Sequence, residues 1–181
     1  MNRVPLIDRH ATTPDRRQLL DTIQRAFGTT PNMFRAVANS PAALQSMWGA
    51  FDALGNGVIA PALAEQIAVA IADRNACEYC LAAHTALGRK AGVSSDALRA
   101  AQAGISPDPK TRAALHFALK LVNARGAIDG ADVQAMRDAD FNDEAIVEVM
   151  AHVALNLFTN YINVALAVPV DFPTVALLRA A

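Results

Sequence analysis

Hydrophobic side chains recur along this chain with the period of an α-helix. Between positions 61 and 75, Leu63, Ile67 and Ile71 fall on one side of a helix, and residues 109–124 repeat the pattern. No segment alternates hydrophobic and polar residues in the way that a half-buried strand does. The pattern therefore predicts an all-α fold of about eight or nine helices in a single domain, residues 1–181.

Capping residues, prolines and glycines mark where these helices begin and end. Thr13-Pro14 and Ser40-Pro41 each place a capping residue before a proline, and Gly28 follows the first predicted helix. The predicted helices span residues 14–27, 32–39, 41–54, 61–75, 77–91, 95–104, 109–124, 129–139 and 143–167. We also expect a last helical turn after Asp171-Phe172-Pro173.

The last long helix is hydrophobic almost all round, from Ile146 to Val168. Such a helix lies either at the centre of a fold or between subunits. Because 181 residues leave limited room to bury it, we expect a homo-oligomer. Asn156, Asn160 and Asn163 recur along it at helical spacing, and we interpret them as hydrogen-bonded packing residues.

Composition narrows the possible partners. Hydrophobic residues make up 53% of the chain, aromatic residues only 6%, and the net charge is −1. This charge gives no indication of nucleic acid or of an anionic membrane. No uninterrupted apolar run reaches the about 20 residues of a membrane span, and residues 1–9 do not resemble a signal peptide. We therefore expect a cytoplasmic protein with no membrane or nucleic-acid partner.

The two cysteines of the chain lie in one short stretch, Cys77-Glu78-Tyr79-Cys80, and His84 follows four residues later. On a helix, Cys77, Cys80 and His84 share one stripe. Their spacing puts the two cysteine Cα atoms about 5–6 Å apart, which a disulfide allows. In the cytoplasm, such a pair is more often catalytic or metal-binding than structural.

A carboxylate on the preceding predicted helix completes this group. If the two helices pack antiparallel through a tight turn near Ala76, Glu65 and His84 lie at similar depth. Glu65 would orient His84, and His84 would share the proton of Cys80 in the first helical turn, where thiolates are stabilised. We therefore predict that Cys80 attacks a hydroperoxide and that Cys77 then forms a disulfide with it. An external dithiol or a protein must reduce that disulfide.

Other interpretations of these residues remain open. The cysteines are inert core residues in one of them, and Cys77, Cys80, His84 and Glu65 bind zinc in another, although no second cysteine pair is present. Tyr79, between the cysteines, either lines an entrance or packs. The remaining histidines are interpreted as structural or exposed: His10, His116 and His152.

The run Glu65-x11-Cys77-x2-Cys80-x3-His84 resembles the signature of the alkylhydroperoxidase D-like branch of the carboxymuconolactone decarboxylase superfamily. The resemblance extends to two flanking regions. Residues 31–35 with Ser40-Pro41 resemble the start of that domain, and residues 156–161 with 171–173 resemble the C-terminal part of an uncharacterised peroxidase-related subgroup.

The resemblance implies an alkylhydroperoxidase D-like helical bundle that forms trimers or hexamers and reduces hydroperoxides without a cofactor or metal. It assigns peroxide attack to Cys80, disulfide formation to Cys77, and proton relay to Glu65 and His84. Tyr79 stands where the best-known members carry a histidine. Two other functions stay open: a decarboxylase acting on a lactone acid, whose chemistry needs no thiol pair, and a non-enzymatic redox sensor.

Overall fold

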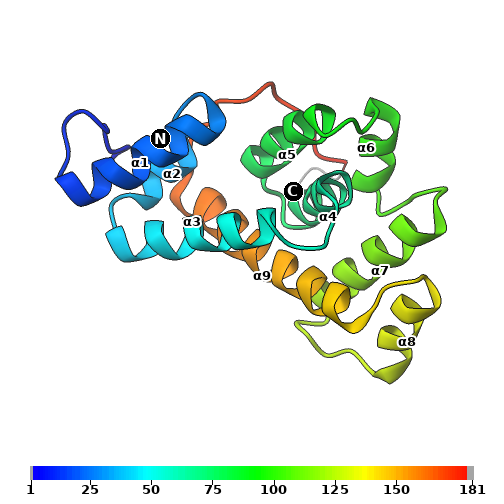
Figure 1. Ribbon diagram of the computed structural model, residues 1–181. Helices are drawn as coiled ribbons and strands as arrows, with labels where there is room; N and C mark the ends of the chain where they lie inside the picture. The colour runs from blue at the N-terminus through cyan, green and yellow to red at the C-terminus, as the bar shows by residue number, and fades with distance from the viewer. Residues whose placement is uncertain (1, 179–181) are drawn as a thin grey trace.

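The computed structural model describes residues 2–178 and contains nine helices within that range (Figure 1). No strand occurs in the described residues, so the predicted all-α fold is confirmed. The helices are α1 (Pro14–Phe27), α2 (Asn32–Val37), α3 (Pro41–Gly55), α4 (Pro61–Arg74), α5 (Glu78–Lys90), α6 (Ser95–Gln102), α7 (Pro109–Asn123), α8 (Gly130–Asp138) and α9 (Asp143–Leu166).

The predicted helix boundaries agree with these bounds to within about two residues because the capping chemistry is local. Ser40, Ser94, Asp108 and Asn142 each accept a hydrogen bond from a backbone amide in the first turn of the helix that follows. Asp129 forms a capping box at α8. These side chains satisfy amides that the first turn of a helix leaves without a partner.

The helical turn predicted after Pro173 is wrong for the residues that the structure describes. Residues 171–178 contain no helix. Their backbone groups bond to side chains of other elements instead: Gln102 Nε2 donates to the Ala176 carbonyl over 2.9 Å, and the Leu178 amide donates to Asp73 Oδ1 over 2.9 Å. These tertiary hydrogen bonds hold the segment extended. Residues 179–181 of the predicted turn lie outside the described range.

Helix α4 separates two hydrophobic cores. On one side, Val69 and Ala72 join a core that contains both cysteines and residues of α1, α2, α3 and α5. On the other side, Ile67 and Ile71 pack in a core shared with α7, α8 and the first half of α9. Both isoleucines are fully buried, and each such side chain stabilises the fold by about 1.5–3 kcal/mol. Helix α4 is therefore the rigid support on which α5 rests.

Helix α9 spans both cores and packs against α2, α3, α4, α5, α7 and α8 (Figure 1). Its length and hydropathy would also suit a membrane span. However, it carries polar side chains that are buried against neighbouring helices, as a core helix does: His152, Asn156, Asn160 and Asn163. The opposite face of α9 leaves large apolar side chains exposed, among them Val147, Met150 and Tyr161.

Candidate redox site

The turn between α4 and α5 places the cysteines. Ala76 adopts a left-handed backbone conformation with φ of 51°, and the Cys77 amide donates to the Ala72 carbonyl over 2.9 Å. This geometry ends α4 and sends α5 back alongside it. Cys77 becomes the N-cap of α5, and Cys80 lies in its first turn, where backbone amides and the helix dipole favour negative charge.

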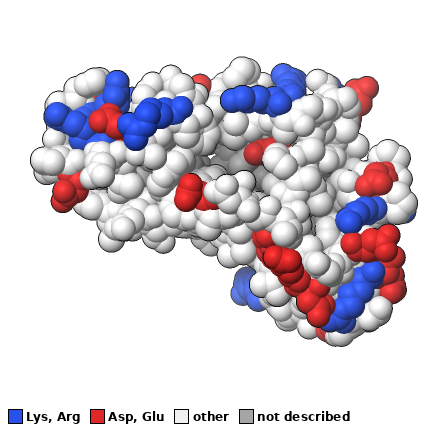
Figure 2. Space-filling view, viewed as in Figure 1, with Lys and Arg blue, Asp and Glu red and all other residues white. Residues whose placement is uncertain are grey.

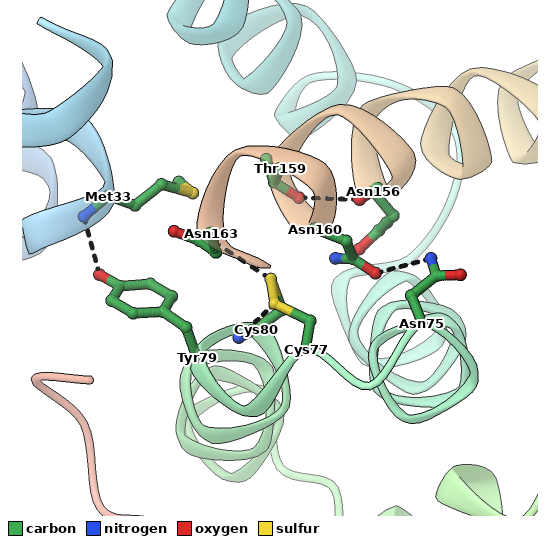
Figure 3. Close-up of a disulfide and its surroundings, with 9 residues drawn as sticks. All are labelled: Met33, Asn75, Cys77, Tyr79, Cys80, Asn156, Thr159, Asn160 and Asn163. Carbon is green, nitrogen blue, oxygen red and sulfur yellow. Dashed lines mark hydrogen bonds between the residues drawn. A yellow bond between two sulfur atoms is a disulfide. The ribbon is translucent and has the colours of Figure 1, made fainter. Parts of the chain in front are cut away.

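Cys77 and Cys80 are joined by a disulfide, with their Cα atoms 5.3 Å apart (Figure 3). The separation agrees with the spacing predicted for two residues three positions apart. Both residues are buried, and the Cys80 amide donates to Cys77 Sγ over 3.2 Å. The two sulfurs therefore lie at the start of α5, close enough for reversible bond formation.

Asn163 supplies a hydrogen bond to the disulfide that the sequence analysis missed. Its Nδ2 donates to Cys80 Sγ over 3.2 Å from the C-terminal part of α9 (Figure 3). The i, i+4, i+7 recurrence of asparagines predicts hydrogen-bonded packing residues, and this is confirmed for Asn160, whose Oδ1 accepts a hydrogen bond from Asn75 Nδ2 over 2.9 Å. The contact between Asn163 and Cys80 Sγ depends on how α9 crosses α5, which the sequence does not reveal.

Glu65 and His84 form the predicted pair. His84 Nδ1 lies 2.8 Å from Glu65 Oε2, and both side chains are largely buried. The carboxylate fixes the orientation of the imidazole ring, and this arrangement is typical of histidines that transfer protons. His84 and Cys80 line the same small cavity, so the structure brings all four predicted residues into one region.

This cavity beside Cys80 has a volume of about 30 Å³, enough for one or two molecules of the size of water. Its walls are mainly apolar and come from α1, α2, α3, α5, α9 and the C-terminal segment. Aromatic rings dominate them: Phe27, Phe34, Phe51, Tyr79 and Phe172. An electrostatic or hydrogen-bonding interaction is stronger in such a dry environment than in water.

Tyr79 both lines this cavity and packs within the core. Its hydroxyl accepts a hydrogen bond from the Met33 amide over 3.2 Å, and its ring meets Phe172 edge-on at 5.8 Å between centroids. Burial raises the pKa of Tyr79 above its ordinary value, so the phenol stays protonated at neutral pH. Tyr79 is therefore a fixed wall of the site, and its ring anchors α2 and the C-terminal segment to α5.

A second cavity, of about 150 Å³, lies on the other side of the Glu65–His84 pair. Phe51, His84 and Thr159 line both cavities and so form the partition between them. Figure 2 shows a hollow on this face of the molecule, between the part built from α1–α3 and the part built from α4–α6. His84 thus borders two cavities of different size, and Glu65 borders the larger one.

His152 faces the second cavity. The sequence predicts a structural or exposed residue, and His152 is buried. Its Nε2 has no hydrogen-bond partner and lies 3.9 Å from Glu148 Oε1. Burial lowers the pKa of His152, which keeps the ring neutral at neutral pH. His10 and His116 are exposed, as expected.

The zinc interpretation finds no support in the arrangement of side chains. Among residues 2–178, no three His, Cys, Asp or Glu side chains are arranged to hold a metal ion. The sulfurs of Cys77 and Cys80 are bonded to each other, and His84 directs Nδ1 to Glu65. The donor set of this site therefore suits thiol–disulfide and proton-transfer chemistry.

Comparisons with known proteins agree with this geometry. The sequence model of the Carboxymuconolactone decarboxylase family matches residues 40–124, the part of the chain that contains Glu65, both cysteines and His84. A structure described as an alkylhydroperoxidase AhpD core, an uncharacterized peroxidase-related protein from Ralstonia eutropha JMP134, is 28% identical with a TM-score of 0.84. The alignment covers 94% of this chain and 92% of that one. The family match and this neighbouring structure support the alkylhydroperoxidase D/carboxymuconolactone decarboxylase superfamily.

Two further solved structures share the fold of this superfamily member. An uncharacterized peroxidase-related protein from Silicibacter sp. TM1040 is 25% identical over 96% of this chain and 90% of that one, with a TM-score of 0.79. The debrominase Bmp8, in complex with 2,3,4-tribromopyrrole, is 20% identical over 93% of this chain and 91% of that one, with a TM-score of 0.76. No curated protein matches the chain in sequence.

The superfamily predicted from the Glu–Cys–Cys–His spacing is thus confirmed, and so is its helical fold. The matched segment extends from the cap of α3 to the end of α7. Helices α1, α2 and α9 lie outside it, although they supply Phe27, Phe34 and Asn163 to the cavity beside Cys80. Part of the cavity wall beside Cys80 is therefore built by residues outside the segment that the family model matches.

Proposed function

We propose that this protein is a thiol-dependent peroxidase that reduces hydroperoxides through Cys80 and Cys77, with Glu65 and His84 as the proton relay. One observation carries the proposal. The Cys77–Cys80 disulfide and the Glu65–His84 pair lie together, and Cys80 and His84 both line a cavity of about 30 Å³. A peroxide group fits such a cavity, whereas a bulky substrate group does not.

The reaction begins with Cys80 as a thiolate. The first turn of α5 and the Asn163 side-chain amide both stabilise negative charge on its sulfur. The thiolate attacks the terminal oxygen of the hydroperoxide, the O–O bond breaks, and Cys80 becomes a sulfenic acid. The leaving alkoxide takes a proton from His84, and Glu65 holds the imidazole in position for that transfer.

Cys77 completes the cycle. Its thiolate attacks the sulfenic sulfur of Cys80, and water leaves with a proton supplied by the relay. The sum is two thiols and one hydroperoxide converted into a disulfide, an alcohol and water. Because sulfur carries the electrons, the scheme needs neither haem nor flavin, but it needs an external dithiol or a protein reductant.

Stopped-flow kinetics with a small hydroperoxide test the proposal. Reduced wild-type protein should lose two thiols for each peroxide consumed and turn over when a dithiol is supplied. Cys80→Ser should abolish peroxide consumption, and Cys77→Ser should stop after one turnover with a sulfenic acid on Cys80. A sulfenic acid that forms on Cys77 alone would reverse the assignment.

The same variants separate the other functions. Lactone-acid decarboxylation would survive Cys80→Ser, because it needs no thiol. A redox sensor would oxidise once and would not turn over with a dithiol. The fold relationship to a debrominase adds brominated pyrroles as probes. Thiol-dependent debromination would release one bromide for each disulfide formed.

A further inference from the structure

The C-terminal segment, residues 169–178, lies across the cavity beside Cys80. Asn32 holds its first part in two places: the Asn32 amide donates to Asp171 Oδ2 over 2.8 Å, and Asn32 Nδ2 donates to the Pro169 carbonyl over 3.2 Å. Side chains of α4 and α6 bond to the backbone of residues 176–178. The segment therefore runs from α2 to α4 and α6, and it contacts α5 on the way (Figure 1).

Phe172 is the side chain of this segment that lines the cavity. Its ring meets Tyr79 edge-on at 5.8 Å between centroids, and it shares the cavity wall with Cys80. Because Phe172 is only half-buried, it stands between the cavity and solvent. Four other half-buried residues of the cavity wall all belong to helices: Phe27, Phe51, His84 and Leu87.

These helical walls are held more firmly than Phe172. Phe27 packs against two further aromatic rings, those of Phe34 and Trp48. Phe51 and His84 face the second cavity on their other side, so they separate two interior spaces. Leu87 belongs to α5, which rests on α4. The C-terminal segment contains no helix, so its side chain is the part of the wall that can change without displacing a helix.

The size of the cavity makes this wall important for the substrate. A hydroperoxide brings an organic group as well as the two oxygens that react. The volume of about 30 Å³ accommodates the peroxide group, because a water molecule occupies about 10–15 Å³ by the same measure. A phenyl ring or a long alkyl chain exceeds this volume and must extend past a wall residue. In a close-packed wall, a difference of one methylene changes which groups fit.

We propose that Phe172 is the residue that determines substrate size at this site. Its ring restricts the substrates of Cys80 to hydrogen peroxide and to hydroperoxides with a small alkyl group. The identity of the substrate rests on the proposed function, whereas the restricted access to Cys80 applies to any electrophile. The organic group lies against the ring of Phe172, which the bonds of Asn32 to the neighbouring backbone and side chain keep in place.

Phe172→Ala and Phe172→Trp test the proposal because they change the wall in opposite directions. In single turnovers of reduced protein, the rate with cumene hydroperoxide relative to the rate with hydrogen peroxide should rise about tenfold or more in Phe172→Ala. The same ratio should fall below the wild-type value in Phe172→Trp. Misfolding cannot produce opposite changes in the two variants.

Val175→Ala is the matched control. Val175 is half-buried in the same segment but lines a different pocket, beside α6, so its truncation should leave the ratio at the wild-type value. Leu87→Ala probes the neighbouring wall of the cavity itself. A ratio that rises in Leu87→Ala and stays unchanged in Phe172→Ala would overturn the role of Phe172.

Alkylation of Cys80 separates this proposal from the proposed function. In reduced Cys77→Ser protein, Cys80 is the only thiol. The rate with N-phenylmaleimide relative to the rate with iodoacetamide should rise about tenfold or more when Phe172→Ala is added. An unchanged ratio would overturn the proposal. The expected rise in a protein that does not reduce hydroperoxides would support the size limit at Phe172 and overturn the proposed function alone.

Discussion

Glu65 and His84 lie nineteen positions apart in the chain, and their side chains meet at 2.8 Å. The contact exists because α5 returns along α4 after the left-handed Ala76. Ile67 and Ile71 anchor α4 in the hydrophobic core, so α4 holds the Glu65 carboxylate in a fixed position. The pair therefore has the fixed geometry that proton transfer requires.

Glu65→Gln should slow the oxidation of Cys80 by hydroperoxide about 100-fold, because the amide no longer orients or balances a protonated His84. Stopped-flow measurement of thiol loss in single turnovers checks this value. Asp52→Asn, at an exposed carboxylate on α3, is the control and should leave the rate unchanged. A wild-type rate in Glu65→Gln would exclude the carboxylate from the relay.

Asn163→Ala should destabilise the Cys80 thiolate, because the variant loses the side-chain amide that donates a hydrogen bond to the sulfur. In a Cys77→Ser background, iodoacetamide should then alkylate Cys80 about tenfold more slowly at pH 7. Asn160→Ala is the matched control: Asn160 is equally buried on the same helix and bonds to Asn75 rather than to sulfur. Equal rates in the two variants would show that Asn163 only packs.

Glu148→Gln should weaken the fold at neutral pH by about 1–2 kcal/mol. Burial alone would raise the pKa of Glu148, but hydrogen bonds from the Val58 and Ile59 amides, with nearby His152, hold it below the ordinary value of 4.5. The stabilisation is complete above 4.5 and is lost as the pH falls through the lower, folded-state pKa.

Urea unfolding between pH 7 and pH 3 measures this contribution. The wild-type and Glu148→Gln proteins should differ at pH 7 and converge toward pH 3. Glu144→Gln is the control, because Glu144 is exposed on the same helix and should change stability by less than about 0.5 kcal/mol. A difference that stays constant over the whole range would show that the Glu148 hydrogen bonds do not depend on its charge.

The exposed apolar face of α9 predicts self-association into a trimer or hexamer. Val147, Met150 and Tyr161 are 65%, 40% and 63% exposed. The accessible surface of 9324 Å² also exceeds the about 8,400 Å² typical of a 19.1 kDa monomer. Met150→Glu combined with Tyr161→Glu should therefore yield a monomer in sedimentation velocity. Leu178→Glu, at an exposed leucine of the C-terminal segment, should not.

The outcome decides whether this face is an interface. A wild-type monomer at micromolar concentration, or a double variant that keeps the wild-type sedimentation coefficient, would contradict the prediction. Partners of other kinds and a cytoplasmic location remain predictions from composition alone.

Much of the local structure was determined by the sequence itself. Capping residues such as Ser40, Asp108 and Asn142 act on amides three positions away, so helix boundaries follow from neighbours in the chain. The Cys77–Cys80 spacing fixes the separation of their Cα atoms for the same reason. The approach of Glu65 to His84 needed one further assumption, the antiparallel turn near Ala76, and that assumption was correct.

The tertiary structure alone decided what surrounds the sulfurs. Asn163 meets Cys80 across 83 positions, and Asp73 and Gln102 hold residues 171–178 extended where a helical turn was predicted. Such contacts depend on how α9 crosses α5 and where the chain runs after α9, and no short-range periodicity encodes them. Sequence spacing determined which groups could react, whereas long-range packing decided which side chains surround the sulfurs, because cavities form only between elements that are distant in the chain.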